Sequence, residues 1–488
     1  MFETPFFPDW RHRLAPMGSR TAQTVRRARS YTLCQLETCF APWVPSALFP
    51  KAPDHQNSRD CLYTRWRTFW CMLWQGLNPG ASGREVVRQL QALFGLEDGP
   101  QISEEDGAYC RAKARLPLSE FPKGLAATAQ AADQLAPRLT TLQGRPLKVI
   151  DGSTVTLPDT PKNRLAYPPI QCPDIPSLPM IRIVVFFSLL SGAISALAQG
   201  SLSVSELSLF SLLSSQLAPG DILLGDRGFG SYPLVAWLFH SLKVDFIGRT
   251  TRRIDGRRRL QRLGKNDWLI LWKKGPEPSA WLSALQWAGL PAQITLRAVK
   301  GSCYHKGFRV RQVTVVTTLL DPQLYPAHEI LEAYRRRWRL EMCLDDLKTT
   351  LEMEMLRGRS PEMAQKEIYA RLIGHNLIRC LMAQAASTHA RGLDSISFKG
   401  SLDALRQFSQ AMARARSRKK RRQLWDKLLD TLAADSLPHR PGRREPRAVK
   451  RKKNKYPRLD SPRHQFRDPP KRNVRRKNAR LRKLALLM

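Results

Sequence analysis

Residues 221–250, DILLGDRGFGSYPLVAWLFHSLKVDFIGRT, contain the pattern that decides the fold of this chain. The run DILLGDRGF is typical of a buried strand that ends in a turn, SYPLVAWLFHSL has the spacing of a helix, and VDFIGRT predicts another short strand. A strand, a helix and a strand in this order form the unit that joins parallel strands in one sheet. This stretch therefore predicts an α/β protein.

The residues upstream add three strands to that unit. LKVIDGSTVTL at 147–157 predicts one strand, and IRIVVFFSL at 181–189 with ISALAQGSL at 194–202 predicts a hairpin. SVSELSLFSLLSSQL at 203–217 predicts a helix. Three strands followed by helix, strand, helix and strand indicate a mixed α/β sheet, and this is also the order of a ribonuclease-H-like fold.

The rest of the chain divides into segments of different composition. Residues 250–325 hold short β-like runs and arginine-rich turns, which predict a mostly β insertion. A long helical region begins near Ala327, so we expect the α/β core to comprise residues 141–249 and 326–385. The remaining predicted segments are an irregular basic N-terminus, a helical domain, a C-terminal helical region and a basic tail, at 1–62, 63–140, 386–436 and 437–488.

The charge of the chain indicates its class of partner. The 80 Lys and Arg against 41 Asp and Glu give a formal net charge of +39. This surplus points to a polyanion, either nucleic acid or an anionic membrane, and argues against an ordinary small-molecule enzyme. A membrane span is not predicted, because the most apolar stretch, residues 183–198, is shorter than the ~20 residues that a spanning helix needs.

Two further features indicate where the protein resides. The N-terminus lacks the basic-then-apolar order of a signal peptide. The nine cysteines include no Cys-x-x-Cys pair, which is typical of reduced thiols rather than of disulfides or a zinc site. We therefore expect a soluble cytoplasmic protein.

The C-terminal tail holds part of the positive charge. Residues 437–488 contain 20 Lys and Arg but three Asp and Glu, together with seven prolines and few apolar residues. Such a composition predicts a disordered segment that adds salt-sensitive affinity for nucleic acid. The remainder of the chain is still strongly basic, so the tail does not account for the whole surplus.

The helical domain at 63–140 is a predicted DNA-binding unit. Aromatic and apolar residues recur in it at helical spacing, and two short helices there carry Arg84, Arg88 and Arg111. These three arginines are the predicted DNA contacts of the domain. The alternative is a small basic helical bundle that does not touch DNA.

Two aspartates end predicted strands of the sheet. Asp151 follows the apolar run LKVI and is followed by Gly152. Asp226 follows the run ILLG and is followed by Arg227 and Gly228. Ligands of open α/β sheets bind at the carboxyl ends of strands, where both carboxylates are expected. Either pattern alone is more often a strand that ends in a turn.

A helix near residue 340 presents an aligned set of polar side chains. In YRRRWRLEMCLDDLK, the residues Tyr334, Arg337, Glu341 and Lys348 fall within an arc of about 60° at 100° per residue, beside a stripe of leucines. A phenol, a guanidinium, a carboxylate and an ammonium group on one face favour a functional site. A solvated charged face is the alternative.

These residues resemble a known signature. Tyr-x2-Arg-x3-Glu-x6-Lys is similar to the signature of DDE transposases of bacterial insertion-sequence family four. DGSTVTLPDTPKN at 151–163 resembles the first-aspartate motif of that family, GDRGF at 225–229 its second, and LRGRSPEMAQKEIYARLIGHNLIR at 356–379 the helix after its glutamate. SGREVVRQL and AYCRAKARLP resemble its N-terminal domain. The resemblance covers residues 65–382 and leaves out the basic tail.

The resemblance implies a metal-dependent reaction on DNA. Asp151, Asp226 and Glu341 would be the catalytic, metal-binding triad, and carboxylate oxygens suit Mg²⁺ or Mn²⁺. Two ions would serve an in-line phosphoryl transfer. Cut-and-paste transposition would begin with a nick at the transposon end, and the freed 3′-hydroxyl would then attack a strand, often giving a hairpin end. The partners would be terminal inverted repeats, target DNA and a second copy of the chain in a synaptic dimer.

Other residues would handle the DNA around the scissile bond. Tyr334, Arg337 and Lys348 would hold the flanking phosphates. A hairpin end requires an extruded base, which an aromatic side chain of the insertion would receive or replace. The predicted candidates are Trp268, Trp272, Trp281 and Trp287, although tryptophan in a β run is more often part of a core.

Two other functions compete with a transposase. A non-catalytic DNA-binding protein derived from such an enzyme would have lost one acid, whereas all three positions are filled here. A structure-selective endonuclease of the same fold would not need the β insertion or the Tyr-Arg-Glu-Lys helix. The phosphate-loop pattern is absent from the sequence, so no nucleotide cofactor is predicted.

Overall fold

A computed structural model gives the three-dimensional structure of the chain. The predicted basic tail except Leu437, and residues 1–33 and 51–61 of the predicted irregular N-terminal segment, lie outside the residues that it describes. Residues 34–50, expected to be irregular, form a helix at Cys34–Phe40 and two short 3-10 turns. The described residues are 34–50, 62–95, 102–137, 141–169, 177–250, 259–302, 312–415, 417–435 and 437.

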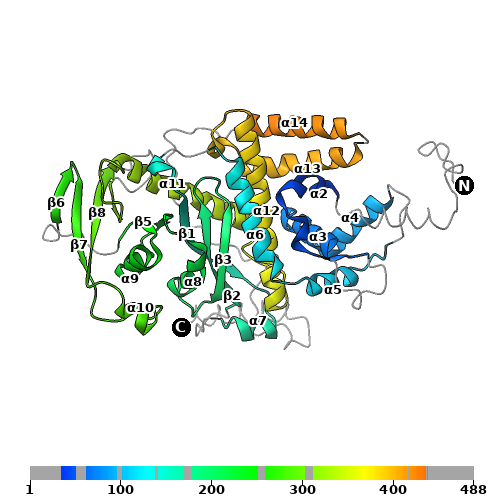
Figure 1. Ribbon diagram of the computed structural model, residues 1–488. Coiled ribbons are helices and arrows are strands. Elements are labelled where there is room, and N and C mark those ends of the chain that lie inside the picture. Colours follow the sequence, from blue (N-terminus) through cyan, green and yellow to red (C-terminus); the bar gives the residue numbers. More distant parts are fainter. Residues whose placement is uncertain are drawn as a thin grey trace, which may run out of the picture.

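One nine-stranded sheet dominates the half of the molecule that is drawn in green in Figure 1. Its strands lie side by side in the order β3-β2-β1-β4-β5-β9-β8-β7-β6. They are β1 (Leu147–Thr156), β2 (Met180–Ser188), β3 (Ile194–Ser201), β4 (Ile222–Gly225), β5 (Asp245–Gly248), β6 (Arg259–Gly264), β7 (Asp267–Lys273), β8 (Gln293–Ser302) and β9 (Gln312–Thr317).

The sheet is mixed, as the sequence predicts. Strands β1, β2 and β3 form an antiparallel meander. Strand β4 then pairs parallel to β1, and β5 pairs parallel to β4. The connections into β4 and β5 contain the helices α8 (Glu206–Leu213) and α9 (Tyr232–Ala236), so they are the crossovers that parallel pairing requires.

The insertion extends this sheet and does not form a separate layer. Strand β9 pairs antiparallel to β5, and β8, β7 and β6 continue outward from it as an antiparallel series. A short helix, α10 (Ala284–Ala288), connects β7 to β8 and has a capping box at Ser283 and Gln286. The far edge of the sheet therefore consists of residues that the sequence assigns to the insertion.

Each face of the sheet has its own apolar core, because strand side chains alternate between the faces. Val149 on β1 and Leu224 on β4 belong to the larger core, while Ile150 and Leu223 belong to the smaller one. We call these two sides the α12 face and the α8 face, after the helices that contribute to each core.

The helix α12 (Pro361–Thr388) is the longest element of the α12 face. Ser360 accepts a hydrogen bond from the backbone N–H of Met363, and Pro361 occupies the first helical position, so the start of the helix is fixed locally. Of its 28 residues, 20 are buried. A helix that is buried on nearly all sides holds together the elements around it.

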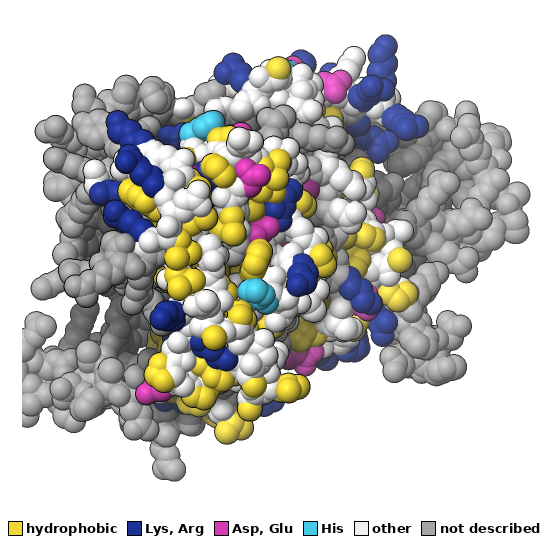
Figure 2. Space-filling view, turned by 60° about the vertical axis from the view of Figure 1, so that its left-hand side comes forward, with side chains coloured by type: hydrophobic (Ala, Val, Ile, Leu, Met, Phe, Trp, Pro, Cys, Tyr) yellow, Lys and Arg dark blue, Asp and Glu magenta, His cyan; other side chains and the backbone are white. Residues whose placement is uncertain are grey.

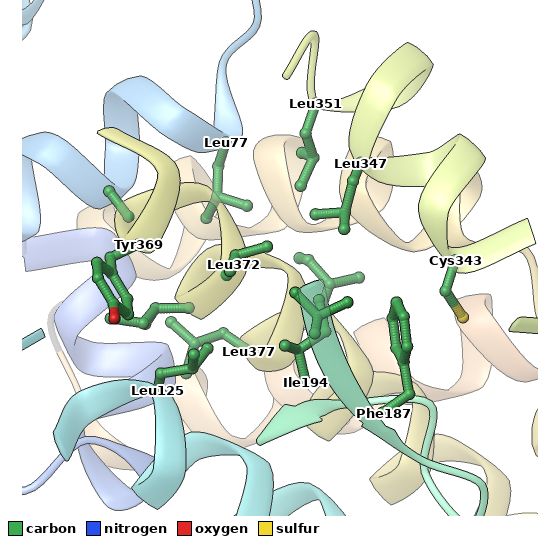
Figure 3. Packing of buried hydrophobic residues seen from close by; sticks show 14 of the residues in the cluster. Leu77, Leu125, Phe187, Ile194, Cys343, Leu347, Leu351, Tyr369, Leu372 and Leu377 are labelled. Carbon is green, nitrogen blue, oxygen red and sulfur yellow. The ribbon is translucent and has the colours of Figure 1, made fainter. Parts of the chain in front are cut away.

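Figure 3 shows which elements meet around this helix. Leu372, Leu377 and Tyr369 of α12 lie among apolar side chains from the sheet, the N-terminal helices and the segment before α12. The labelled neighbours are Leu77, Leu125, Phe187, Ile194, Cys343, Leu347 and Leu351. The N-terminal helices and the sheet therefore share one continuous core.

The predicted helical region at 63–140 consists of several helices. Thr64 caps the first long one by accepting a hydrogen bond from the N–H of Arg67, and Gly80 permits the next turn with φ of +85°. The helices on this side are α2 (Cys34–Phe40), α3 (Arg65–Leu77), α4 (Gly83–Gly95), α5 (Gly107–Arg115), α6 (Glu120–Leu135), α13 (Phe398–Arg414) and α14 (Arg418–Ala434).

None of the helices in the described part of the chain is both long and apolar enough to cross a lipid bilayer.

Candidate active site

The first predicted catalytic residue, Asp151, lies within β1 and beside the end of β4. Val149 on β1 is opposite Leu224 on β4 in parallel register. Two positions further along both chains, Asp151 and Asp226 are neighbours on strands that run about 4.8 Å apart. Because they lie two residues beyond a pair that faces α12, both carboxylates point to the α12 face.

Asp226 is held by the turn that follows β4. Its Oδ1 atom accepts hydrogen bonds from the backbone N–H of Gly228 at 2.8 Å and of Phe229 at 3.4 Å. A Cβ atom on Gly230 would lie 1.6 Å from the carbonyl oxygen of Arg249, just after β5. Only glycine allows the turn to lie this close to the next strand, so GDRGFG is a compact support for Asp226.

The signature helix α11 (Ala327–Asp345) also contributes to the α12 face. Tyr334 is 1% exposed and Arg337 is 5% exposed. The guanidinium carbon of Arg337 lies 5.3 Å from the centre of the Tyr334 ring, which is a cation–π contact, and the two side chains are also hydrogen-bonded.

The electrostatics of Tyr334 connect this helix to the strand ends. Burial raises the pKa of its phenol, while the positive charges of Arg337 and Arg249 lower it and the carboxylate of Asp226 raises it. Tyr334 is thus within electrostatic range of one predicted metal ligand. Tyr334 and Arg337 are both buried, so their predicted contact with DNA phosphates stays a prediction.

The third acid lies in the same helix. The backbone of Glu341 belongs to α11, but its side chain, like those of residues 338–340, lies outside the described part of the structure. Asp345, at the end of α11, is exposed.

The helix does not continue regularly to Lys348. After Asp345 it widens into a π-helical turn, η9 (Asp346–Thr350), which holds Lys348. The predicted arc assumes 100° per residue, whereas a π turn winds by less, so Lys348 is displaced from the line of the other three residues. Its side chain is partly exposed.

The oxygen-only donor set fits a hard divalent cation. The two aspartates on neighbouring strands supply carboxylate oxygens, which Mg²⁺ and Mn²⁺ prefer. Among the residues whose side chains are described, no three His, Cys, Asp or Glu residues come together as a metal site. A complete site on this face therefore depends on the side chain of Glu341.

Comparisons with known proteins agree with this arrangement. The family model described as "Transposase DDE domain" matches residues 142–377, which include both aspartates and α11. The transposase InsG for insertion sequence element IS4, from Escherichia coli (strain K12), is 26% identical over 401 residues, which are 80% of this chain and 85% of that protein. The chain belongs to the DDE transposases of bacterial insertion-sequence family four.

Two other known proteins match this chain either over a shorter length or with lower structural similarity. The transposase for insertion sequence element IS421, from Escherichia coli, is 35% identical over 66 residues, 14% of this chain and 18% of that protein. The solved structure of a piggyBac transposase synaptic complex with hairpin DNA has a TM-score of 0.39 and 12% identity, over 83% of this chain and 87% of that chain.

The segment after α11 in this transposase is fixed to the first-aspartate strand. Thr156, at the end of β1, exchanges backbone hydrogen bonds with Glu354 and Leu356. The amide of Asn163 donates to the carbonyl oxygens of Pro158 and Gly358. Asn163 is fully buried and orders this loop, which joins the two halves of the site.

The three predicted DNA-contacting arginines of the helical domain lie on the surface of the transposase. Arg84 and Arg88 are exposed on α4, and Arg111 is exposed on α5. Arg84 lies 3.5 Å from the exposed carboxylate of Glu105, a pair that solvent screens. Their exposed positions agree with the predicted contact with DNA.

The four tryptophans predicted as candidates for an extruded base lie on the opposite face of the sheet from the two aspartates, and this role stays a prediction. All belong to or pack against the core of the α8 face, whereas Asp151 and Asp226 point to the α12 face. Trp272 is 1% exposed and contacts Tyr232, so it is a core residue of the insertion. Trp281 contacts Trp237, and Trp268 and Trp287 lie under Arg259 and Lys274.

The sequence did not identify two arginines that matter to the geometry of the transposase. Arg249 follows β5 and acts electrostatically on Tyr334. Arg357 donates to the carbonyl oxygens of Ala81 at 2.6 Å and Gly80 at 2.8 Å. The position of Arg249 at a strand end was a usable signal, but nothing local to Arg357 indicates a partner almost 280 residues away.

Proposed function

We propose that this transposase binds the terminal repeats of its insertion sequence and cuts and joins DNA by metal-dependent phosphoryl transfer. Asp151, Asp226 and Glu341 would hold the metal ions. The observation that carries this proposal is the parallel register of β1 and β4, which makes the two aspartates neighbours on the face that α11 covers. The reaction would take place on DNA of the bacterial nucleoid.

We assign the core to the ribonuclease-H-like class on its strand order. The first five strands run β3-β2-β1-β4-β5, with β1, β2 and β3 antiparallel and β4 and β5 parallel to β1. The carboxyl end of β4 lies beside the middle of β1, so Asp226 and Asp151 are neighbours close to a strand end, which is where open α/β sheets place their chemistry. The insertion enters after β5 and returns as β9 beside it.

The residues have separable tasks in the proposed reaction. When bound, two Mg²⁺ or Mn²⁺ ions would supply Lewis acidity to the attacking and leaving oxygens. The turn at Asp226 keeps its carboxylate in place through two backbone N–H groups. Tyr334 and Arg337 would position α11 against the strand ends, and Lys348, which is partly exposed, would contact a flanking phosphate.

The sequence of bond changes follows from the class of reaction. Attack of water on the phosphodiester at the transposon end breaks the bond to the 3′-oxygen, which leaves as a hydroxyl after taking up a proton. That 3′-hydroxyl loses its proton and attacks a second phosphodiester, where the bond to the 3′-oxygen of that strand breaks and this oxygen leaves as a hydroxyl after taking up a proton. The product is either a hairpin end or a joint to target DNA. Two ends must be held together, so we propose that two copies of the chain act as a dimer.

The first alternative is a transposase-derived DNA-binding protein without catalysis, and the second is a structure-selective endonuclease. Filled acid positions argue against the former, and the insertion that extends the sheet argues against the latter. Both remain testable by the same experiment.

The test is cleavage of labelled duplex DNA that carries the terminal repeat of the element, with Mg²⁺, at saturating protein. We expect Asp226→Asn and Glu341→Gln each to reduce end-specific cleavage by more than about 100-fold, since loss of groups that support metal ligands alone costs 10–100-fold. Binding to the same DNA should persist in both variants.

Asp345→Asn is the matched control, because it removes an exposed carboxylate from the same helix as Glu341. It should leave cleavage unchanged. Cleavage that survives Asp226→Asn would overturn the metal-site assignment. Repeat-specific binding with no cleavage by any form would favour the non-catalytic alternative, and cleavage of branched DNA without preference for the repeat would favour the endonuclease.

A further inference from the structure

A concentrated positive charge lies between the two C-terminal helices, α13 and α14. Residues 414–422 read RARSRKKRR, with seven basic residues and no acidic one among nine. We call the described part of this segment in the first turns of α14, residues 418–422, the basic turn. The preceding helix, α13, ends at Arg414, and α14 begins at Arg418.

The cations of the basic turn are open to solvent. The residues of the first turn and beyond, Arg418, Lys419, Lys420, Arg421 and Arg422, are all exposed. In the part of the chain that the structure describes, none of these five forms an ion pair. Asp430, further along α14, lies 3.3 Å from His389 instead.

This distribution of charge opposes the stability of the helix that carries it. The N-terminus of a helix has a partial positive charge, so cations in the first turn are unfavourable there. Arg418 is also three and four residues from Arg421 and Arg422, and like charges at these spacings repel. No acidic residue lies in the first turn of α14 to offset the effect.

The other half of α14 explains why the helix forms in spite of this. Leu428, Leu429 and Leu432 are buried, and Trp425 contacts Trp43 of the N-terminal part with ring centres 6.1 Å apart. The apolar half anchors the helix to the body of the molecule. The cations of the basic turn are therefore not needed for folding, and a bound polyanion would relieve their repulsion.

The position of the basic turn separates it from the predicted acids. Figure 1 draws α13 and α14 together on the helical side, above α2 and α3, whereas β1, which contains Asp151, lies in the sheet on the other side of α12. At 100° per residue, five successive cations surround the helix instead of forming one stripe. Such a cluster suits phosphates approached from several directions better than base edges in a groove.

We propose that the basic turn is a second DNA-binding surface, which holds the phosphate backbone of duplex DNA independently of sequence. This inference rests on the proposed function, because it assumes that the transposase works on DNA. The duplex held there would be DNA outside the cleaved bond, either flanking or target.

The test compares Lys419→Gln/Lys420→Gln/Arg421→Gln with wild type in the full chain, using a labelled duplex that lacks the terminal repeat. If three phosphate contacts are lost, the slope of log affinity against log salt concentration should fall by about 2.7, at about 0.9 per phosphate. In the absence of DNA, the same variant should have a higher melting temperature at low salt, because repulsion at the helix start is removed. A merely solvated charged surface does not predict these two opposite effects together.

The charge-matched control is Lys123→Gln/Lys243→Gln/Lys427→Gln, which removes three exposed cations from scattered positions. An equal loss of salt slope in the control would overturn the proposal, as would an unchanged slope in the triple variant of the basic turn. If the triple variant of the basic turn bound DNA as the wild type does but no longer bound to a polyglutamate column, the basic turn would be a surface for an acidic protein instead. Cleavage of the transposon end by the wild-type protein is measured in a separate assay. If that cleavage failed, the proposed function would be refuted, but a difference in salt dependence between the two triple variants would still test the basic turn.

Discussion

At the scale of single residues, the buried ion pair of Asp267 and Arg297 links the insertion to the signature helix. Arg297 donates to both carboxylate oxygens of Asp267, at 2.9 and 2.6 Å, and to the carbonyl oxygen of Tyr325 at 2.7 Å. Tyr325 lies two residues before α11, which begins at Ala327. The side chain of Arg297 has no exposed surface. The pair therefore fixes the approach to α11.

Asp267→Ala should lower the free energy of unfolding by about 3–5 kcal/mol, because it leaves a buried guanidinium without its carboxylate. Urea denaturation followed by circular dichroism measures this. The double variant Asp267→Ala/Arg297→Met should recover much of the loss, since no uncompensated charge then remains. A decrease below about 1 kcal/mol for the single variant would show that water or a rearranged partner replaces the carboxylate.

The residues of the site differ in how far the sequence could reveal them. Asp226 was predictable as the residue that follows the apolar run of β4, whereas Asp151 was expected at a strand end and lies instead inside β1, which continues to Thr156. The parallel pairing of β1 with β4 nevertheless makes the two residues neighbours. The burial of Tyr334 and Arg337 was not predictable from the sequence, because helical spacing shows which residues share a face of a helix but not what covers that face. The spacing of residues in the sequence likewise did not show that the four tryptophans lie across the sheet from the two aspartates, and their role at an extruded base stays a prediction.

At the scale of elements, the turn after β4 and the end of β5 depend on each other. Gly230 lies against the backbone of Arg249, where a methyl group would overlap the carbonyl oxygen. The same turn contains the two N–H groups that bind Asp226. A small displacement of this turn moves a predicted metal ligand.

Gly230→Ala should therefore reduce end-specific cleavage by about 100-fold or more, since displacement of a reacting group by ~1 Å can cost that much. Cooperative unfolding should be retained, because the change lies at the edge of the core. Gly392→Ala is the control, because a Cβ atom there meets no atom within 4 Å. Wild-type cleavage by Gly230→Ala would mean that the turn relaxes without moving Asp226.

The sequence predicted which segments form strands and which form helices better than it predicted how those elements pair and pack. Alternation and helical spacing identified the strands around the aspartates and the helices on either side, since those signals are local. Residues 250–325 were expected to be mostly β, but their pairing with β5 in one continuous sheet depends on contacts distant in sequence. The π turn at Asp346–Thr350 has no sequence pattern that regular helical periodicity detects.

At the scale of the whole molecule, three cationic side chains join segments that are distant in the sequence. Arg357 donates to the carbonyls of Gly80 and Ala81, and Arg406 binds the carbonyl of Leu77. Lys366, which is fully buried, binds the carbonyls that end α5. DNA bound on α4 or α5 would therefore be held at a fixed distance from the loop that follows the signature helix.

Not all of the positive charge serves such internal contacts. On the face shown in Figure 2, Lys and Arg side chains form several separate groups with fewer acidic side chains among them. The surplus of +39 is thus spread over the surface of the body as well as over the tail. A distributed charge favours an extended polyanion over one small anionic ligand.

Removal of the C-terminal tail tests how this charge is shared. Residues 437–488 hold 20 of the 80 Lys and Arg, and only Leu437 among them belongs to the described part of the structure. Deletion from Leu437 onward should flatten the salt dependence of DNA binding, by about 0.9 in log–log slope for each phosphate the tail neutralises. Single-turnover cleavage at saturating protein should remain nearly unchanged, because Asp151, Asp226 and α11 lie in the body. If cleavage itself is lost while binding persists, the tail belongs to the active complex.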